Sequence, residues 1–246
     1  IVIAKSIEST LLASVKRRRK SAGGYVTPSI AVVLLLWSDG RQRVPLAFEY
    51  RSGPESVQEL GLRLLRRLRN QFKLKPRCVL FDAGFFSHTF VKRLQSYGWA
   101  FVCRAPRSIT FEGKRLWQFK RQGFWNDPGH LKNGLKVRAI RRAGKFWLCN
   151  RVTWLAETIL AWYGQRASIE EVFRVLKQCC LWGYCQLRSE AAYIRYLATG
   201  LLSFMAWETA RLKAFEPTTI YKLGSTVMFG DGDPPIPDYF KHRRIA

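Results

Sequence analysis

The segment WYGQRASIEEVFRVLKQ, residues 162–178, places an aromatic residue, two cations and a carboxylate at helical spacing. The four residues are Tyr163, Arg166, Glu170 and Lys177. At about 100° per residue they fall within about 60° of one another around a helix, so they form one stripe. The apolar residues of the segment define a face about 100° away, so the stripe borders the predicted core. Glu171 is expected on the opposite, more solvated flank.

Two carboxylates are candidates for chemistry. Asp82 follows the apolar run VLF at the end of a predicted strand, where α/β sheets place their ligands, although Asp also begins turns. Glu170 has two interpretations: an i,i+4 ion pair with Arg166, which would stabilise the helix slightly, or a metal ligand. Carboxylate oxygens bind Mg²⁺ or Mn²⁺, and two such ions about 4 Å apart promote in-line phosphoryl transfer. A two-ion site needs roughly three or four ligands, and these residues supply two of them.

The charge of the chain makes a polyanion its expected partner. The chain has 42 Lys and Arg against 17 Asp and Glu, a formal net charge of +25 over 246 residues. Nucleic acid fits this charge because neutralising phosphates releases counterions. Apolar runs such as residues 30–37 are too short to span a bilayer, and the N-terminus lacks a signal-peptide pattern. We therefore expect no membrane partner and a cytoplasmic location.

Further basic residues are candidate DNA contacts. The run KRRRK comprises Lys16, Arg17, Arg18, Arg19 and Lys20. It predicts a patch that contacts phosphates, and the alternative is a solvated loop between strands. Arg104, at the end of a predicted strand, is another candidate for DNA binding.

Hydrophobic periodicity predicts an α/β core. The expected elements are a strand at 1–4, two strands within 27–50, a helix at 55–73, a strand at 76–85, a helix at 87–98 and a strand at 99–105. A turn at Ser38-Asp39-Gly40 should join the two strands of the hairpin. Alternating strands and helices favour parallel central strands.

The second half of the chain has a different pattern. Glycines punctuate residues 105–153, which predicts a β-rich insertion. Helical patterning is expected from 156 through the 162–178 segment and again at 189–212, whereas the Pro- and Gly-rich tail, 216–246, is expected to be irregular.

Cysteines and tryptophans have structural interpretations first. The six cysteines lack a C-x-x-C pair, so they are expected to be reduced thiols, with Cys78 and Cys103 in the core. Trp117, Trp125 and Trp147 fit the core of the insertion, and stacking on an unpaired base is the alternative.

These motifs together resemble a known family. YGQRASIEEVFRVLK is similar to the Tyr-x2-Arg-x3-Glu-x6-Lys signature of bacterial insertion-sequence transposases of the DDE type, with all four positions matched. VLFDAGFFSHTFVKRLQSYGWAFVCR resembles the strand of that family's second Asp with the following helix and strand, and DGRQRVPLAFEY resembles the preceding hairpin. The resemblance covers most of residues 1–215, which are expected to form the catalytic domain before the tail.

The resemblance implies an α/β fold, an RNase H-like mixed sheet flanked by helices, with the β-rich insertion before the catalytic helix. It implies metal-dependent cleavage and strand transfer on double-stranded DNA, at transposon ends and at a target. Asp82 and Glu170 would bind Mg²⁺ or Mn²⁺, in a two-ion site if the ligand set is intact. Tyr163, Arg166 and Lys177 would contact DNA phosphate. A bacterial, nucleoid-associated protein and a homodimer on DNA are further expectations.

The sequence departs from the family at the first carboxylate. The run IVIAKS offers Ala4 where the family has an Asp after the first strand, and alanine cannot bind a metal. Glu8 is the only acid among the first 38 residues, but it lies four residues later, and Mg²⁺ tolerates little displacement of its ligands. The alternative function is therefore a catalytically inactive, transposase-derived DNA-binding protein. A basic RNA-binding scaffold is a third possibility.

Overall fold

The computed structural model of the chain describes residues 2–9, 18–20, 26–51, 54–119, 124–182, 185–214 and 220. For residues 3–9, 18–20 and 26–29 it describes the backbone alone. The expected tail at 216–246 lies outside the described residues except for Ile220, which is buried. The division of the chain near residue 215 stays a prediction.

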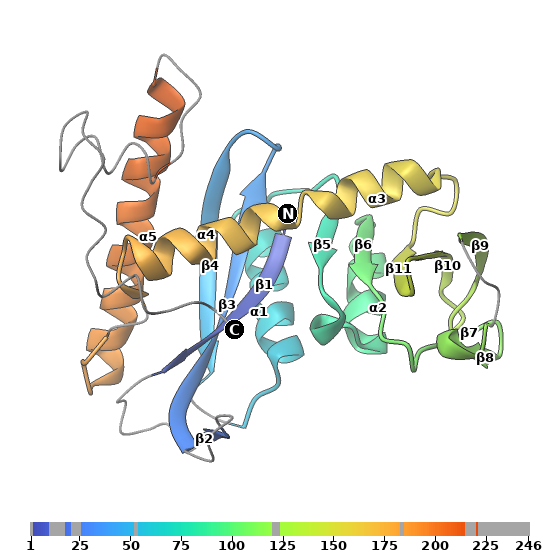
Figure 1. The fold of residues 1–246 in the computed structure, drawn as a ribbon, viewed down its shortest axis with the longest axis horizontal. Helices are drawn as coiled ribbons and strands as arrows, with labels where there is room; N and C mark the ends of the chain where they lie inside the picture. Colours follow the sequence, from blue (N-terminus) through green and yellow to red (C-terminus); the bar gives the residue numbers. More distant parts are fainter. Residues whose placement is uncertain are drawn as a thin grey trace.

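A mixed sheet runs through the centre of the molecule (Figure 1). Its strand order is β2-β3-β1-β5-β6-β11-β10-β9, and β4 also pairs with β3. The strands are β1 (Val2–Ser9), β2 (Arg18–Lys20), β3 (Val26–Ser38), β4 (Arg43–Arg51), β5 (Val79–Phe81), β6 (Phe101–Arg104), β9 (Trp125–His130), β10 (Lys136–Arg142) and β11 (Lys145–Cys149). β1, β5 and β6 run parallel to one another, whereas β3 is antiparallel to β1 and β4. The predicted mixed α/β sheet is confirmed.

Helices cover both faces of this sheet. They are α1 (Val57–Asn70), α2 (His88–Ser96), α3 (Ala156–Gly164), α4 (Ala167–Gln178) and α5 (Glu190–Lys213). Successive side chains of a strand point to opposite faces, and in β3 Val33 and Leu35 join the core with α1 and α2. Val32 and Leu34 join the core with α3, α4 and α5. The molecule therefore has three layers, with α1 and α2 on one face of the sheet and α3 to α5 on the other (Figure 1).

The β-rich region lies between β6 and α3, as predicted. β7 (Thr110–Phe111) and β8 (Lys114–Arg115) form a small separate sheet, followed by the short helix η2 (Leu116–Gln118). The strands β9 to β11 instead extend the main sheet, because β11 pairs antiparallel with β6. The buried side chains of this region divide between the two cores: Val137, Ala139, Phe146 and Leu148 join the core with α1 and α2, whereas Ile140, Trp147 and Cys149 join the core with α3 to α5.

The tryptophans of this region divide into two kinds. Trp125 is 6% exposed and packs with other residues of the insertion, as predicted. Trp147 is 9% exposed but packs in the core with α3 to α5, against Tyr163, and not in a core of the insertion itself. Trp117 is 57% exposed, and its interpretation as a core residue is wrong because η2 turns its ring outward. Base stacking by Trp117 stays a prediction.

Two local signals form as the sequence indicates. In the turn between β3 and β4, the Asp39 carboxylate accepts hydrogen bonds from the backbone N–H groups of Arg41 and Gln42, at 2.9 and 2.7 Å. Gly40 in the same turn has a φ of 96°, which glycine adopts without strain. At the start of α1, Ser56 and Glu59 form a reciprocal capping box that satisfies two backbone donors.

Two predicted boundaries of strands are wrong. The first strand continues to Ser9 because it pairs with β3 along its whole length. The strand predicted at 76–85 contains only Val79–Phe81, because the Asp82 side chain accepts a hydrogen bond from the backbone N–H of Gly84 at 2.8 Å. That bond begins the short helix η1 (Ala83–Phe85).

The helix predicted through residues 162–178 is also two helices. α3 ends at Gly164, a poor helix former, and α4 begins at Ala167. The backbone N–H of Arg166 donates to the carbonyl of Tyr163, and that of Ile169 donates to Arg166, so i,i+3 bonds replace the α-helical pattern here. The backbone φ and ψ of Arg166 stay helical, at −60° and −26°. The residues of the stripe therefore stay on one side of the two helices.

The cysteine predictions are confirmed. All six are free thiols, and Cys78 and Cys103 are buried. Burial raises the pKa of the Cys78 thiol to about 12, so this side chain is neutral at physiological pH.

Gly200 of α5 lies directly against a buried tryptophan from the segment between α4 and α5. A Cβ atom on Gly200 would lie 2.3 Å from Nε1 of Trp182, a fully buried ring that donates to the carbonyl of Leu197. We predict that Gly200→Ala lowers the free energy of unfolding by about 1–3 kcal/mol, because the ring cannot move without disturbing the core. Gly164→Ala is the control, since no atom lies within 4 Å of its Cβ position. Thermal unfolding of both variants measures the difference, and equal midpoints would contradict the packing argument.

Candidate active site

Two carboxylates from different elements share one guanidinium. Asp82 follows β5, and Glu170 lies in the first turn of α4. Nη2 of Arg166 lies 4.0 Å from Oδ2 of Asp82, and Nη1 of the same side chain pairs with Oε1 of Glu170. The structure therefore brings together Asp82, Arg166 and Glu170, and the i,i+4 ion pair considered above forms as part of this cluster.

The sheet register shows what lies beside Asp82. β1 pairs parallel with β5, with Val2 opposite Leu80 and Ile3 opposite Phe81. The next position of β1 is residue 4, so Ala4 occupies the place in the sheet adjacent to Asp82. Glu8 lies four residues further along β1, which corresponds to about 13 Å at about 3.3 Å per residue. The backbone thus places Glu8 far from the shared guanidinium.

Tyr163 borders the cluster through its aromatic ring. The ring packs edge-on against Trp147 at 6.1 Å, and the Arg166 guanidinium lies 5.9 Å from the ring centre. Burial raises the pKa of the Tyr163 hydroxyl, and the nearby Asp82 carboxylate adds to this effect, while Arg166 and Arg104 oppose it. The hydroxyl therefore stays neutral and can donate a hydrogen bond.

The other predicted DNA contacts lie at different distances from the cluster. Arg104 is exposed at the end of β6 and is opposite Trp147 in the sheet. Lys177 is half-buried on the same stripe of α4 as Glu170, two turns or about 10 Å further along the helix. The contact of either residue with DNA stays a prediction.

The basic run is only partly within the described residues. Lys16 and Arg17 lie outside them, and the backbone of Arg18, Arg19 and Lys20 forms β2, which pairs with the start of β3. The alternative interpretation, a loop between strands, is wrong for these three residues, and their predicted contact with phosphate stays a prediction.

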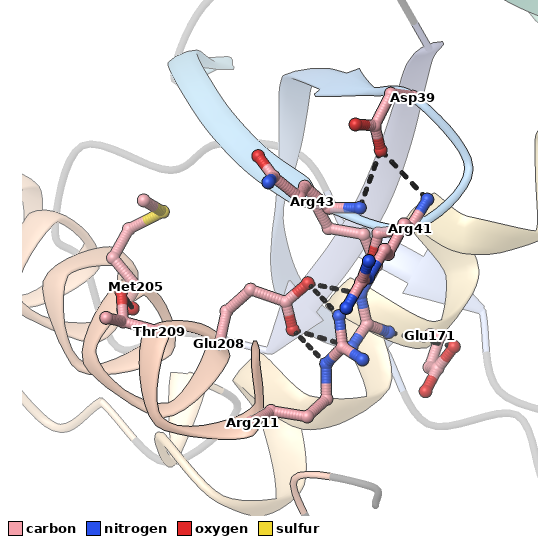
Figure 2. A network of polar contacts seen from close by, with 9 residues as sticks. Asp39, Arg41, Arg43, Glu171, Met205, Glu208, Thr209 and Arg211 are labelled. Atoms are coloured by element: carbon pink, nitrogen blue, oxygen red, sulfur yellow. Dashed lines mark hydrogen bonds and ion pairs between the residues drawn. The ribbon is translucent and has the colours of Figure 1, made fainter. Parts of the chain in front are cut away.

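A buried ionic network that the sequence analysis missed holds α4 in place (Figure 2). Arg43 and Glu208 are 7% and 2% exposed, and the Arg43 Nε and Nη2 groups donate to the two carboxylate oxygens of Glu208 at 3.0 and 2.7 Å. Nη1 of Arg43 lies 2.9 Å from Glu171 of α4, so the expected solvated position of Glu171 is only half right. Arg211 donates to Glu208 from the other side and to the carbonyl of Arg41. β4, α4 and α5 are thereby joined next to Glu170.

One signal in the sequence could have revealed this network. Glu208 continues the buried positions of α5 that Leu197, Gly200 and Phe204 occupy, so a charge interrupts an otherwise apolar face. A charge on such a face requires a partner. Its partner is 165 residues away in sequence, however, and spacing alone does not identify it.

The donors present fit one divalent cation better than two. The guanidinium between Asp82 and Glu170 shows that the pair accommodates positive charge. Mg²⁺ is commonly bound through one or two carboxylates, with water or substrate phosphate at the remaining positions. Among the described residues, no group of three or more His, Cys, Asp or Glu side chains could hold a metal ion. A second ion lacks the carboxylate that position 4 would supply.

Comparison with known proteins identifies the family. The family model described as Transposase DDE domain matches residues 20–205.

The chain belongs to the transposase DDE domain family.

A solved structure agrees with this assignment in fold. The transposase chain resembles a chain in the cryo-EM structure of the piggyBac transposase synaptic complex with hairpin DNA, with a TM-score of 0.50 and 12% sequence identity. The match covers 96% of this chain and 58% of that one, so the chain spans little more than half the length of that transposase. The expected RNase H-like fold is confirmed.

Other comparisons add little. The NurA nuclease from Sulfolobus solfataricus has a TM-score of 0.34 and 11% identity, over 88% of this chain and 86% of that one, and carries no argument here. No curated protein matches the transposase chain. In the part of the chain that the structure describes, no helix is both long enough and apolar enough to cross a membrane.

The buried network generates a stability prediction. Glu208→Gln removes the carboxylate that Arg43 needs, and we expect the free energy of unfolding to fall by about 3–5 kcal/mol because a buried charge loses its partner. Glu55→Gln breaks the exposed pair with Arg63 and should lower the free energy of unfolding by less than about 1 kcal/mol. Chemical denaturation at neutral pH measures both changes, and similar losses in the two variants would contradict a special role for the buried pair.

The same variant has a characteristic pH dependence. Burial raises the pKa of Glu208, but hydrogen bonds from Arg211 and Arg43 outweigh burial, and the pKa in the folded chain lies below the ordinary 4.5. The carboxylate therefore adds stability above pH 4.5, and this contribution is lost as the pH falls through the folded pKa. In denaturation at a series of acidic pH values, the free energy of unfolding should fall less steeply with decreasing pH for Glu208→Gln than for the wild-type chain.

Proposed function

We propose that this chain is the catalytic domain of a DNA transposase of the bacterial insertion-sequence type, acting on double-stranded DNA at transposon ends and at a target. The observation that carries the proposal is the Arg166 guanidinium between Asp82 and Glu170, which places two carboxylates from separate elements at one site. Membership of the DDE family and the matched four-residue signature support it. The piggyBac neighbour is in complex with hairpin DNA, which supports a DNA partner.

Each residue of the cluster has a role in this proposal. Asp82 and Glu170 would hold Mg²⁺ or Mn²⁺, which when bound supplies Lewis acidity at the scissile phosphate. Arg166, whose side chain is 17% exposed, is placed to exchange a carboxylate for a phosphate oxygen when DNA arrives. The neutral hydroxyl of Tyr163 donates to a phosphate oxygen. Arg104 and Lys177 bind neighbouring phosphates and set the position of the strand.

A second function is favoured by the residue beside Asp82. Ala4 has no oxygen to offer, and Glu8 is about 13 Å further along the strand at about 3.3 Å per residue. A chain with this ligand set binds transposon ends without cutting them. Such a chain would be a transposase-derived DNA-binding protein of the nucleoid. It would act as a homodimer when it holds two ends.

Restoring the first carboxylate distinguishes the two functions. We predict that Ala4→Asp shows Mn²⁺-dependent nicking of a duplex carrying the element's own end, because it adds the third ligand beside Asp82. The first function requires that the wild-type chain also nicks this duplex, whereas the second function requires that the wild-type chain gives no nicking above background. The measurement is gel analysis of an end-labelled duplex, with Asp82→Asn in the Ala4→Asp background as the inactive control.

The opposite result has a definite meaning. Nicking by the wild-type chain that is lost in Glu8→Gln would show that Glu8 serves as the first ligand and that the chain is an active enzyme. Specific binding to the duplex without nicking by any variant would contradict the catalytic proposal and leave the DNA-binding function.

The shared guanidinium predicts competition for the carboxylates. Without DNA, Arg166→Gln should bind Mn²⁺ about three- to tenfold more tightly than the wild-type chain, because each partly exposed ion pair that is removed is worth up to about 1 kcal/mol. Electron paramagnetic resonance of free Mn²⁺ measures this affinity without any reaction. Arg174→Gln removes an exposed cation from the same helix and is the control for general electrostatics. Equal tightening in both variants would exclude a specific competition.

A further inference from the structure

The layer formed by α1 and α2 carries far more positive charge than the layer with the candidate active site. Helices α1 and α2 together contain six Lys and Arg against one acid, Glu59. Helices α3, α4 and α5 together contain five Lys and Arg against five Asp and Glu. The two layers lie on opposite faces of the sheet, so the excess charge is remote from α4 (Figure 1).

Two sets of arginines lie along α1, and only one set has acidic partners. Arg63 and Arg67 lie one turn apart and pair with Glu49 of β4, and Arg63 also pairs with Glu55. Arg66 and Arg69 are exposed on another side of the helix, and within the described ranges no ion pair involves either of them.

The second set continues onto α2 through an aromatic ring. The guanidinium of Arg69 lies 4.4 Å from the ring centre of Tyr97, and that of Arg93 lies 5.9 Å from the same ring. Arg93 is exposed and belongs to the last turn of α2. Two cations are thus fixed beside one ring, where a nearby polyanion would relieve their mutual repulsion. Lys73, exposed just after α1, extends the set.

These four residues, Arg66, Arg69, Lys73 and Arg93, form what we name the α1–α2 basic surface. α1 and α2 cover one face of the sheet, whereas α4 covers the other. Both α1 and α2 also end near the start of β5 and β6, whereas Asp82 lies at the end of β5. A duplex on the Tyr163–Lys177 stripe and a duplex on this surface would therefore lie on opposite faces of the sheet.

We propose that the α1–α2 basic surface binds the phosphate backbone of a second DNA duplex, so that one chain bridges two duplexes. The inference rests on the proposed function for its DNA partner. Arginines held on an aromatic ring bind phosphate through a planar, always charged group and lose little side-chain freedom on binding. Contacts to phosphate carry no sequence information, so binding through these cations would be independent of sequence.

The test uses two short duplexes of arbitrary sequence, one with a donor and one with an acceptor fluorophore, mixed with the full chain without metal. Energy transfer between the duplexes reports bridging, and anisotropy of one duplex alone reports simple binding. The double variant Arg69→Gln, Arg93→Gln should lose most of the energy transfer and keep the binding of one duplex. For the bridging step, the slope of log affinity against log salt should fall by about 2, close to 0.9 per lost phosphate contact.

The matched control is Arg63→Gln, Arg67→Gln. It removes two arginines from α1 by the same substitution, but from the set that pairs with Glu49 and Glu55. It should keep both the energy transfer and the salt slope. Thermal unfolding of the two double variants confirms that both are folded.

Several outcomes would overturn the inference. Energy transfer that persists in the Arg69, Arg93 variant would show that bridging has another origin, such as dimerisation. Equal losses in the two variants would show a general effect of charge. A wild-type chain that binds one duplex and never bridges contradicts the surface and leaves the proposed function in place, whereas a chain that binds no duplex contradicts both. Tighter binding to vesicles of anionic lipid than to duplex would reassign the surface to a membrane.

Discussion

The buried pair between Arg43 and Glu208 is the constraint on which the candidate active site depends. It joins the start of β4 to the last turns of α5. Nη1 of Arg43, which Glu208 does not contact, extends the link to Glu171 on α4. A buried charge pair fixes the relative orientation of its elements, because moving one partner away would leave the other as an unpaired buried charge. The carboxylate of Glu170, one residue before Glu171, therefore has a defined position relative to Asp82 on the sheet.

The cluster around Arg166 and the α1–α2 basic surface use arginine in opposite ways. Arg166 offsets one of the two negative charges of Asp82 and Glu170, so the site is closer to electrically balanced when DNA is absent. The basic surface has no such acid partners within the described ranges, and its charge remains available to an external anion. The cationic side chains thus lie in two settings: Arg166 offsets charge at the candidate active site, and the basic surface leaves positive charge exposed to attract anions from a distance.

Much of this arrangement could be predicted because its signals are local. Asp39 and Gly40 specify the hairpin turn, and Asp82 could be placed at a sheet edge because it follows a short apolar strand. Glu170 and Arg166 could be paired by helical spacing, but that spacing could not show the i,i+3 bonds that separate α3 from α4. The link between Arg43 and Glu208 spans 165 residues, and only the folded chain reveals it.

The pairing of β11 with β6 has a mechanical consequence. Because this ladder makes the inserted strands part of the central sheet, and their buried side chains contribute to the cores on both faces, the described part of the insertion is held firmly against the rest of the sheet. Movement of the inserted strands toward a bound DNA strand would break the hydrogen bonds between β11 and β6. In the proposed function, adaptation would therefore fall to the nucleic acid itself, through bending or unpairing, or to the movement of one whole subunit against another.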